Sequence, residues 1–533
     1  MARLKEYNGR YCESEYEYAF IGFLEAEGWK YSSGNNISRV TKRDVLIADD
    51  FKKFIADTNP DLTEDEVIQI YDNVRLVGAE SDFATLHKVY GWMVNGVQFT
   101  TQDGLPRMIP LIDFDNWDKN IFRVVNQFTV EYTNNGQKEN RRPDVLLFVN
   151  GMPLCVIELK NPADANATIY DAWEQINIRY WRDIPHLLHY CPLACISDGV
   201  KTRLGTVRTP YEHFYAWRRV NEGDAVSTLP FAETETMIKG VYAPERFMEI
   251  FRDYIYFQDS IYDSDEVEII CRYPQFFAAK LLKQSIVNSV VTRSGKGGTY
   301  FGATGCGKTY TMAFLARQLA LRCTDIPEIG SPTIILIVDR DELQKQGSKL
   351  FTKSKEFLNL GEVSVVKNRT QLRQELGARQ SGGFYICTIQ KFCDRKDDKI
   401  GLINDRQNII CFSDEAHRTQ LEHSKKIQFS KDADENMKAM VSKPYAKVLK
   451  EAFPHATFVG FTGTPIAETY QTFGDEIDRY TMDQAVADGL TVSIKYHPRI
   501  AKVLLDNKKV KEIENYYKKC ADDGATYEEI EAS

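Results

Sequence analysis

The segment GATGCGKT, Gly302–Thr309, restricts the folds open to this chain more than any other feature. It matches the pattern G-x-x-x-x-G-K-[ST], in which glycines let backbone N–H groups curl around a phosphate. A short β-prone run, Thr299–Phe301, precedes it, and the residues after it predict a helix over Tyr310–Leu321. A strand, a glycine loop and a helix in this order predict a parallel α/β sheet with a nucleotide site.

The positions of this loop have expected roles. Lys308 is expected to bridge the β- and γ-phosphates, and the hydroxyl of Thr309 to ligate Mg²⁺. The other positions expected to contact the nucleotide are Gly302, Thr304, Gly305, Cys306 and Gly307. An incidental glycine-rich turn is the alternative, but the flanking strand and helix favour the nucleotide site. The expected cofactors are therefore ATP and Mg²⁺.

Two further motifs follow apolar runs downstream. NIICFSDEAH, Asn408–His417, is a buried-type strand that ends in two acids. Asp414 is expected to hold the hydrated magnesium ion and Glu415 to polarise the attacking water. The alternative is an acidic helix N-terminus, where Asp and Glu are also favoured. The second motif, FTGTP at Phe461–Pro465, is a strand followed by a Gly-Thr-Pro turn.

The length of 533 residues predicts about three domains, because one hydrophobic core rarely grows that large. We expect a first domain over 1–260, a second over 261–500 and the start of a third region over 501–533. In the second, short apolar runs alternate with helical segments, as in a parallel sheet. These predicted strands are Thr299–Phe301, Thr333–Val338, Phe384–Thr388, Ile409–Ser413 and Thr457–Phe461.

The segment RPDVLLFVNGMPLCVIELK, Arg142–Lys160, predicts a β-hairpin in the first domain. Asn150-Gly151 is a strong hairpin signal, although we expect Met152-Pro153 to lengthen the turn. The start of one strand then lies opposite the end of the other, which brings Asp144 close to Glu158. Glu158 and Lys160 are two residues apart and project from the same face.

Two carboxylates and an ammonium group at one end of a sheet suit metal-dependent phosphodiester cleavage. Asp144 and Glu158 offer the hard oxygen ligands that Mg²⁺ prefers. Lys160 would orient or deprotonate the nucleophilic water, or neutralise the charge that develops on the phosphate. The alternative is an edge hairpin whose charges face solvent.

Composition limits the partners. The net charge is −9, from 67 basic and 76 acidic residues, so any DNA contact must be a local groove or be shared with a partner. No apolar run approaches the ~18 residues that span a membrane, and no secretory signal is visible. Eleven cysteines without paired spacing predict reduced thiols in a cytoplasmic protein instead of a zinc site or disulfides.

Together, the glycine loop, the DEAH strand and the FTGTP turn resemble the first RecA-like lobe of superfamily 2 helicases and translocases. The resemblance implies that Thr462 and Thr464 couple the nucleotide state to the grip on nucleic acid. It also implies that His417 relays between these sites and that Gln275 reads the adenine. The segment Ile386–Phe392 looks like the family's nucleic-acid contact.

The spacing Asp144…Glu158-x-Lys160 resembles the PD-(D/E)xK nuclease fold. The order of IELKNP, an AWEQI…RY helix, an SDG turn and a superfamily 2 motor resembles the restriction (motor) subunit of type I restriction–modification systems. In that family the helix carries Gln-x-x-x-Tyr, whereas here Gln175 and Tyr180 are five residues apart. Five residues turn an α-helix by roughly 500°, so we expect poor alignment and assign a supporting catalytic role to Gln175 alone.

The resemblance implies an α/β chain with an N-terminal PD-(D/E)xK-like domain and a RecA-like motor lobe. It implies an ATP-dependent endonuclease and translocase that cuts double-stranded DNA away from its recognition site, with methylase and specificity subunits as partners. Too few residues follow Pro465 for a second lobe of ~150 residues, so we expect a portion of a longer protein with incomplete ATP turnover. The alternatives are a helicase–nuclease of another restriction or repair type and a non-catalytic, ATP-gated DNA-binding scaffold.

Overall fold

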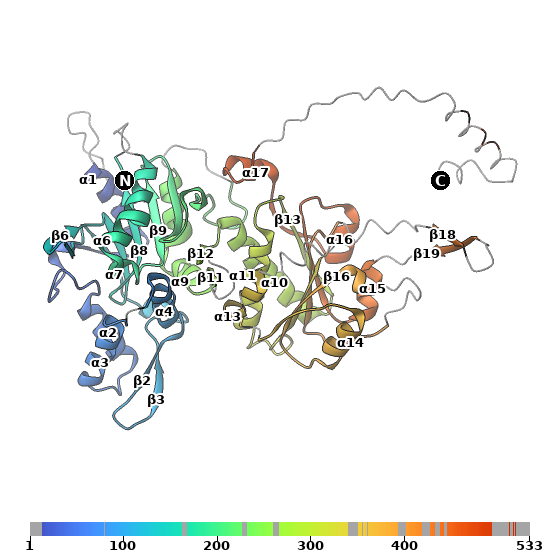
Figure 1. Cartoon of the computed structure of the whole chain (residues 1–533), viewed down its shortest axis with the longest axis horizontal. Helices are drawn as coiled ribbons and strands as arrows, with labels where there is room; N and C mark the ends of the chain where they lie inside the picture. The colour runs from blue at the N-terminus through green and yellow to red at the C-terminus, as the bar shows by residue number, and fades with distance from the viewer. Residues whose placement is uncertain are drawn as a thin grey trace. The chain divides into compact units, whose positions relative to one another are not determined.

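The computed structural model describes residues 13–492, apart from 79, 162–167, 226–231, 259–265, 339–349, 354, 360, 393–400, 418–426, 432–436 and 442–444. Beyond 492 it describes positions 511, 515 and 518. The described residues up to Thr491 fall in one compact unit (Figure 1). The segment 501–533 thus lies almost wholly outside the described residues, and so does the predicted boundary at 260. The domain limits stay a prediction.

A six-stranded mixed sheet forms the centre of the N-terminal half, with strand order β1-β4-β7-β8-β9-β10. β7 and β8 are buried at every residue, as their continuous apolar runs predict for central strands. β8 pairs antiparallel with β7 and parallel with β9. The strands are β1 Lys30–Ser33, β4 Phe122–Asn126, β7 Val145–Val149, β8 Met152–Leu159, β9 Leu193–Ser197 and β10 Thr202–Thr206.

Helices and two-stranded ribbons surround this sheet. The helices are α1 Glu13–Ala26, α2 Ala48–Thr58, α3 Glu64–Arg75, α4 Asp82–Asn95, α5 Ile169–Glu174, α6 Trp181–Asp183, α7 Pro185–Leu188, α8 Ala232–Met237 and α9 Pro244–Asp253. The ribbons pair β2 Val97–Thr100 with β3 Pro106–Ile109, β5 Val130–Asn134 with β6 Gln137–Arg141, and β11 Ile255–Gln258 with β12 Val267–Ile270.

The near-helical spacing of the apolar residues from Met237 to Ile255 indicates a helical stretch, and the structure divides this segment. A π-helical turn separates α8 from α9, and Pro244 starts α9 at a position where its missing N–H costs no hydrogen bond. Ile255 already belongs to strand β11. The apolar spacing in this segment therefore continues across two helices and a strand.

The hairpin between β7 and β8 has a tighter turn than expected. Val149 pairs directly with Met152, so the loop contains two residues and is not lengthened. Asn150 and Gly151 have φ values of 50° and 76°, as a type I′ turn requires. The side chain of Asn150 accepts a hydrogen bond from the backbone N–H of Ile121 (2.8 Å), which ties the turn to the chain just before β4.

A seven-stranded parallel sheet forms the centre of the C-terminal half, with strand order β15-β16-β14-β17-β20-β13-β21. All five predicted strands are present in it. The strands are β13 Lys296–Gly302, β14 Thr333–Val338, β15 Val363–Val365, β16 Phe384–Thr388, β17 Ile409–Ser413, β20 Thr457–Thr462 and β21 Glu476–Tyr480. Its helices are α10 Tyr273–Thr292, α11 Lys308–Arg322, α13 Lys355–Leu358, α14 Arg369–Ala378, α15 Tyr445–Ala452, α16 Ala467–Phe473 and α17 Met482–Ala487. A separate ribbon pairs β18 Ile427–Lys431 with β19 Met437–Val441.

The two strands that the sequence did not predict, β15 and β21, lie at the edges of this sheet. Both are partly exposed along most of their length, so their sequences VSV and EIDRY carry little apolar signal. Cysteine side chains that the structure describes are free thiols and buried. Within the described parts of the chain, no helix has the length and apolar character needed to cross a membrane.

Gly151 and Gly136 give a matched test of the β7–β8 turn. Each is the second residue of an Asn-Gly turn with φ near 80° (76° and 79°). A Cβ at Gly136 would meet nothing within 4 Å, whereas a Cβ at Gly151 would overlap the carbonyl oxygen of Ile47. We expect Gly136→Ala to cost about 1–2 kcal/mol of unfolding free energy from the backbone alone. Gly151→Ala should cost about 1–3 kcal/mol more, from overpacking.

Urea unfolding followed by far-ultraviolet circular dichroism measures both losses. Equal losses for the two variants would show that close packing of the turn against α2 contributes nothing to stability.

Candidate functional site

A bulge in β8 decides which side chains of the hairpin face one another. With the two-residue turn alone, Asp144 would fall opposite Ile157. The register shifts by one residue near Leu154, so that Val145 pairs with Ile157 and Asp144 falls opposite Glu158. Opposed residues of an antiparallel pair point to the same face, and a one-residue slip would turn Glu158 to the other face. The bulge therefore puts both carboxylates on one side of the sheet.

Hydrogen bonds connect the residues predicted for this site. Oδ2 of Asp144 accepts from the backbone N–H of Leu159 (2.9 Å). Lys160 Nζ donates to Oε1 of Gln175 (3.0 Å), and Nε2 of Gln175 donates to Oε2 of Glu158 (2.7 Å). Because Gln175 contacts both, Glu158 and Lys160 project from the same face. The structure brings the four predicted residues together.

The expectation that Tyr180 is poorly aligned with Gln175 is wrong. Residues Gln175–Tyr180 form a π-helical turn, in which hydrogen bonds run from residue i to i+5. Side chains five residues apart therefore lie one above the other. The hydroxyl of Tyr180 donates to Oε1 of Glu158 (2.5 Å) and accepts from Nε2 of Gln175 (2.8 Å). Tyr180 belongs to the site, and the extra residue in the spacing is absorbed by the wider turn.

The surroundings of Glu158 suit a bound cation. Its side chain is fully buried, and burial raises the pKa of Glu158 well above its usual range. The charge of Asp144 raises that pKa further, against an opposing effect of Lys160. A divalent ion bound between the two carboxylates would relieve their repulsion and favour the ionised form of Glu158. Among the described residues no group of three or more His, Cys, Asp or Glu side chains is placed to hold one metal ion, so a bound ion would take further ligands from water or phosphate oxygens.

A pocket of about 700 Å³ opens beside Asp144, Gln175 and Tyr180. Arginines from β6, the start of the hairpin, the π-helical turn and α6 line it, together with Gln127 and Asn140; they are Arg141, Arg142, Arg179 and Arg182. Their positive charge suits a phosphate backbone. The sequence analysis did not find them, because they are scattered among different elements and only the fold gathers them.

Gln127 is a further residue of this pocket that the sequence gave no reason to select. It follows β4 with a φ of 53°, a left-handed conformation that is uncommon outside glycine. Its backbone N–H donates to the carbonyl oxygen of Asp144 (3.0 Å). Its side-chain amide donates to Oε2 of Glu17 on α1 (2.6 Å). Through these contacts Gln127 holds the backbone at Asp144.

The glycine loop lies between β13 and α11, as predicted. A Cβ at Gly302 would lie 2.6 Å from a ring carbon of Tyr300 and 3.1 Å from Sγ of Cys306, so only glycine fits there. Gly305 and Gly307 have φ values of 82° and 84°, which side-chain-bearing residues rarely adopt. These backbone conformations direct the loop back to the start of α11.

Lys308 is the first residue of α11, followed by Thr309 in the same turn. Nζ of Lys308 donates to the carbonyl oxygen of Gly302 (3.2 Å) and lies 3.8 Å from Oε1 of Glu415. Thr304 is exposed at the tip of the loop, whereas Cys306 is buried beneath it. The positive end of the helix and the ammonium group thus share one place where a phosphate can bind.

The acids of the second motif lie at the carboxyl end of β17, next to this loop. Burial raises the pKa of Asp414 to about 6, and the nearby Lys308 partly opposes the effect. Such a carboxyl is ready to accept a cation. Nδ1 of His417 lies 2.8 Å from the Thr462 hydroxyl and 3.4 Å from a carboxylate oxygen of Glu415.

The third motif, FTGTP at Phe461–Pro465, contacts the same group of residues. The hydroxyl of Thr462, which contacts His417, accepts from the backbone N–H of Thr464 (3.1 Å). A Cβ at Gly463 would lie 3.2 Å from the Thr304 hydroxyl, so this turn approaches the glycine loop directly. Residues from three separate strand ends therefore meet at one edge of the parallel sheet.

Gln275 contacts the glycine loop, with its Nε2 donating to the carbonyl oxygen of Gly307 (3.3 Å). Its Oε1 accepts from the backbone N–H of Arg272 (2.9 Å). Arg272 was not selected from the sequence. Its guanidinium carbon lies 4.1 Å from the ring centre of Tyr215, and its buried Nη1 has no hydrogen-bond partner among the described residues. Arg272 is thus a candidate contact for a nucleotide.

The segment predicted to touch nucleic acid, Ile386–Phe392, runs from β16 into a 3-10 turn over Ile389–Phe392. Ile389 and Phe392 pack into the core, whereas Gln390 is exposed. A contact with nucleic acid from this segment would therefore involve the turn.

Comparison with known proteins divides the chain in the same way. Residues 11–213 match the model of the type I restriction enzyme R protein N terminus. Residues 274–529 match the SWI2/SNF2 ATPase model. The first match contains the group of residues around Asp144 and Glu158. The second contains the group around the loop Gly302–Thr309.

Curated relatives match along most of this chain. The type I restriction enzyme HindI endonuclease subunit of Haemophilus influenzae is 31% identical over 91% of this chain and 46% of its own length. A relative from Methanocaldococcus jannaschii, with a name of the same class, is 30% identical over 96% of this chain and 49% of its own. The chain thus spans about half the length of these curated relatives.

A solved fragment of a type I restriction enzyme subunit from Vibrio vulnificus aligns over 70% of this chain and 57% of its own. The identity is 17% and the TM-score 0.26, which is too low to show a shared fold. The two family models, in contrast, match in the same order as the two sites along the chain. The names of the curated relatives agree with the N-terminal model. The chain therefore joins a segment that matches the N terminus of type I restriction enzyme R proteins to a segment that matches SWI2/SNF2 ATPases, and over most of its length it resembles proteins named as type I restriction enzyme endonuclease subunits.

Proposed function

We propose that this chain carries the nuclease centre and the first motor lobe of an ATP-dependent, Mg²⁺-dependent DNA endonuclease subunit of a type I restriction system. The observation that carries the proposal is the meeting of Asp144, Glu158 and Lys160 beside an arginine-lined pocket. The same chain contains a phosphate-binding loop whose lysine and neighbouring acids also meet. The full-length protein would move along double-stranded DNA and cut it away from the recognised sequence.

The chain's own residues have distinct roles in cleavage. Asp144 and Glu158 would hold the magnesium ion, which supplies an activated water and stabilises charge on the phosphate when bound. Lys160 would orient the attacking water or neutralise the developing charge. Gln175 fixes Lys160 against Glu158, and Tyr180 holds the second oxygen of Glu158.

The motor residues have corresponding roles. Lys308 would bind the β- and γ-phosphates, while Thr309 and Asp414 would hold the magnesium ion. Glu415 would polarise the attacking water, and the His417–Thr462 contact would transmit the nucleotide state. Residues of the loop and its surroundings would make further contacts with the nucleotide: Gln275, Arg272, Gly302, Thr304, Gly305, Cys306, Gly307 and Thr464.

Partners are part of the same proposal. The chain has a net negative charge, and four arginines gather at one pocket. This distribution suits a local contact with the backbone of double-stranded DNA more than it suits reading of the base sequence. Recognition and methylation would therefore belong to separate methylase and specificity subunits, in a cytoplasmic complex.

Asp144→Ala or Lys160→Ala, made in the full-length subunit and assembled with its partners, should abolish DNA cleavage. The loss should exceed a hundredfold, because a metal ligand or the positive charge at the phosphate is removed. ATP hydrolysis should continue, since its residues lie on the other sheet. Gel analysis of plasmid cutting and a phosphate-release assay measure the two activities. Asp61→Ala, which breaks an exposed ion pair with Arg107, is the control. Normal cutting by Lys160→Ala would exclude this site.

Tyr180→Phe tests the residue that the π-helical turn adds to the site. The change removes one hydroxyl that donates to the buried Glu158 carboxylate. A hydrogen bond to a charged group contributes about 1.5–3 kcal/mol, so cleavage should fall roughly tenfold to a hundredfold. Tyr170→Phe, at a 46% exposed ring on the preceding helix, should cut at the wild-type rate. Equal rates for both variants in the plasmid assay would place Tyr180 outside the mechanism.

Lys308→Ala should weaken ATP binding by about a hundredfold or more, because the phosphates lose a direct charge-assisted contact. Titration with a fluorescent ATP analogue in the presence of Mg²⁺ measures the affinity of the 533-residue chain. Lys367→Ala, at an exposed lysine of the same half, is the matched control. An unchanged affinity in Lys308→Ala would show that the loop does not bind the triphosphate.

A further inference from the structure

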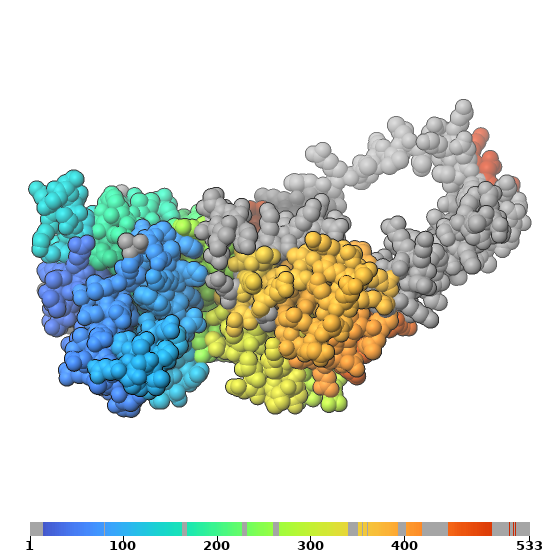
Figure 2. Space-filling view, turned by 60° about the horizontal axis from the view of Figure 1, so that its bottom comes forward, coloured from blue at the N-terminus to red at the C-terminus, as the bar shows by residue number. Residues whose placement is uncertain are grey.

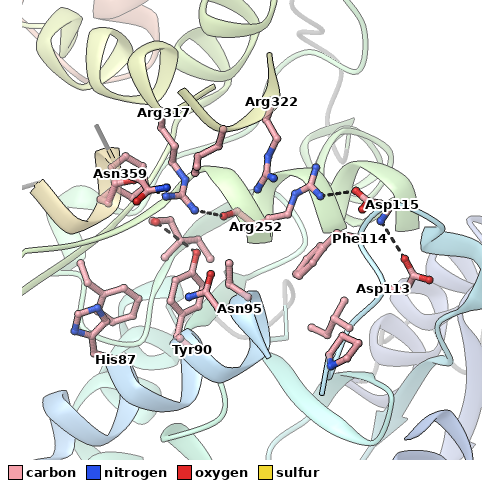
Figure 3. A pocket seen from close by; sticks show the side chains of 18 of the residues that line it. His87, Tyr90, Asn95, Asp113, Phe114, Asp115, Arg252, Arg317, Arg322 and Asn359 are labelled. Atoms are coloured by element: carbon pink, nitrogen blue, oxygen red, sulfur yellow. Dashed lines mark hydrogen bonds and ion pairs between the residues drawn. The ribbon is translucent and has the colours of Figure 1, made fainter. Parts of the chain in front are cut away.

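A hollow of about 860 Å³ lies between the N-terminal half and helix α11 of the motor half (Figure 3). Three arginines reach into it, Arg252 from α9 and Arg317 and Arg322 from α11, which at first suggests an anion site. Several of their donors already have partners within the chain, however. Arg317 donates to the carbonyl oxygens of Phe357 and Arg252, and Arg252 pairs with Asp115 (3.0 Å). The arginines hold the walls of the hollow together.

Asp253 is the centre of these contacts. It is the last residue of α9, and only 1% of its surface is exposed. Arg322 binds both of its oxygens, with Nη2 at 2.6 Å from Oδ1 and Nε at 2.9 Å from Oδ2. Nε of Arg317 lies 3.7 Å away and Nε of Arg252 3.4 Å away. Burial by itself raises the pKa of Asp253, but these guanidinium groups reverse the effect and leave that pKa below its usual value.

Two of the three arginines around Asp253, Arg317 and Arg322, lie on the helix that starts at the phosphate loop. α11 begins with Lys308 and ends with Arg322, so its 15 residues form a rod of about 22 Å. One end of this rod carries the groups proposed to bind phosphate, and the other end is held by Asp253. A helix transmits a displacement at one end to the other because its backbone hydrogen bonds keep it rigid.

α9 itself is fastened to the N-terminal half. The hydroxyl of Tyr90, on α4, donates to the carbonyl oxygen of Phe251 (2.8 Å), and the two rings pack at 5.4 Å. Trp29 packs on Phe247 of α9 at 5.5 Å and on Phe122 of β4 at 5.3 Å. Contacts therefore run without interruption from the sheet that bears Asp144 and Glu158 to Asp253.

A second buried carboxylate ties the two halves on the other side of the phosphate loop. Arg218, from the segment after β10, contacts Oδ1 of Asp488 (2.6 Å). Oδ2 of Asp488 accepts from the hydroxyls of Tyr273 (2.7 Å) and Tyr480 (2.6 Å). The carbonyl oxygen of Tyr480 in turn accepts from the N–H of Ala303 in the phosphate loop (2.8 Å). The N-terminal half thus contacts the C-terminal end of α11 through Asp253, and it is linked to the phosphate loop through Asp488 and Tyr480.

We propose that Asp253 is a positioning residue of the nucleotide site, by which the nuclease half fixes helix α11 and becomes energetically coupled to nucleotide binding. The proposal rests on the nucleotide binding proposed above. Coupling between sites is reciprocal, so a residue that favours nucleotide binding must also let the nucleotide stabilise α9. A residue with a purely structural role would lower stability without this nucleotide-dependent effect.

Asp253→Asn removes the charge and one acceptor position while keeping the side-chain size. The control is Asp50→Asn, which breaks a comparably buried, two-point contact with Arg123 inside the N-terminal half (2.6 and 2.7 Å). Arg322→Gln provides a second variant on the other side of the contact, in case Asp253→Asn does not fold. The 533-residue chain is used throughout. ATP affinity is measured by titration, and hydrogen exchange of residues 244–253 is measured with and without saturating MgATP.

In the wild-type chain we expect MgATP to slow exchange in α9. Asp253→Asn and Arg322→Gln should bind ATP about five- to fiftyfold more weakly and should lose the slowing in α9, while α11 stays protected at saturation. Asp50→Asn should lower the unfolding temperature but keep the affinity and the α9 response. Wild-type affinity together with a preserved α9 response in Asp253→Asn would overturn the inference alone. A wild-type chain that does not bind ATP would overturn the nucleotide proposal itself.

Discussion

Buried carboxylates set the arrangement of both halves, because a negative charge removed from water must find positive partners or lose its charge. Asp253 is surrounded by three guanidinium groups, and its pKa lies below the usual value. Glu158 is also buried and Asp414 partly buried, but each has one lysine nearby and an acid as a neighbour, and their pKa values are raised. The first kind of carboxylate is satisfied within the protein and holds elements together. The second kind is prepared for a cation, as candidate metal sites are.

Two irregularities of the backbone bring together the residues of the proposed nuclease centre. The bulge near Leu154 turns Glu158 to the face of Asp144, and the π-helical turn stacks Tyr180 over Gln175. A regular strand and a regular α-helix with the same sequence would separate both pairs. Such irregularities persist where the surroundings specify them, and they are frequent at functional sites. In this chain the wider turn therefore lets a Gln and a Tyr five residues apart both contact Glu158.

The fold could be predicted wherever burial leaves a mark on the sequence. Five central strands of the parallel sheet were found from their apolar runs, and β7 and β8 from theirs. The edge strands β15 and β21 were missed, since half-exposed strands need few apolar residues. Between Met237 and Ile255 the apolar spacing indicated one helix, although Pro244 divides it and Ile255 begins a strand. The spacing of apolar residues indicates which side chains are buried, but it does not indicate whether they belong to a helix or to a strand.

The sequence by itself determined which short motifs are candidates for the chemistry. Two short motifs carry residue types that suit a metal ion or a phosphate group. They are Asp144 with Glu158 and Lys160, and the loop Gly302–Thr309. The tertiary structure decided which further residues join them. Tyr180, Gln127 and the pocket arginines come from separate elements, and Asp253 meets Arg322 across 69 residues of chain. No local pattern records such meetings, because they depend on how helices and sheets pack, and packing is a property of the whole chain.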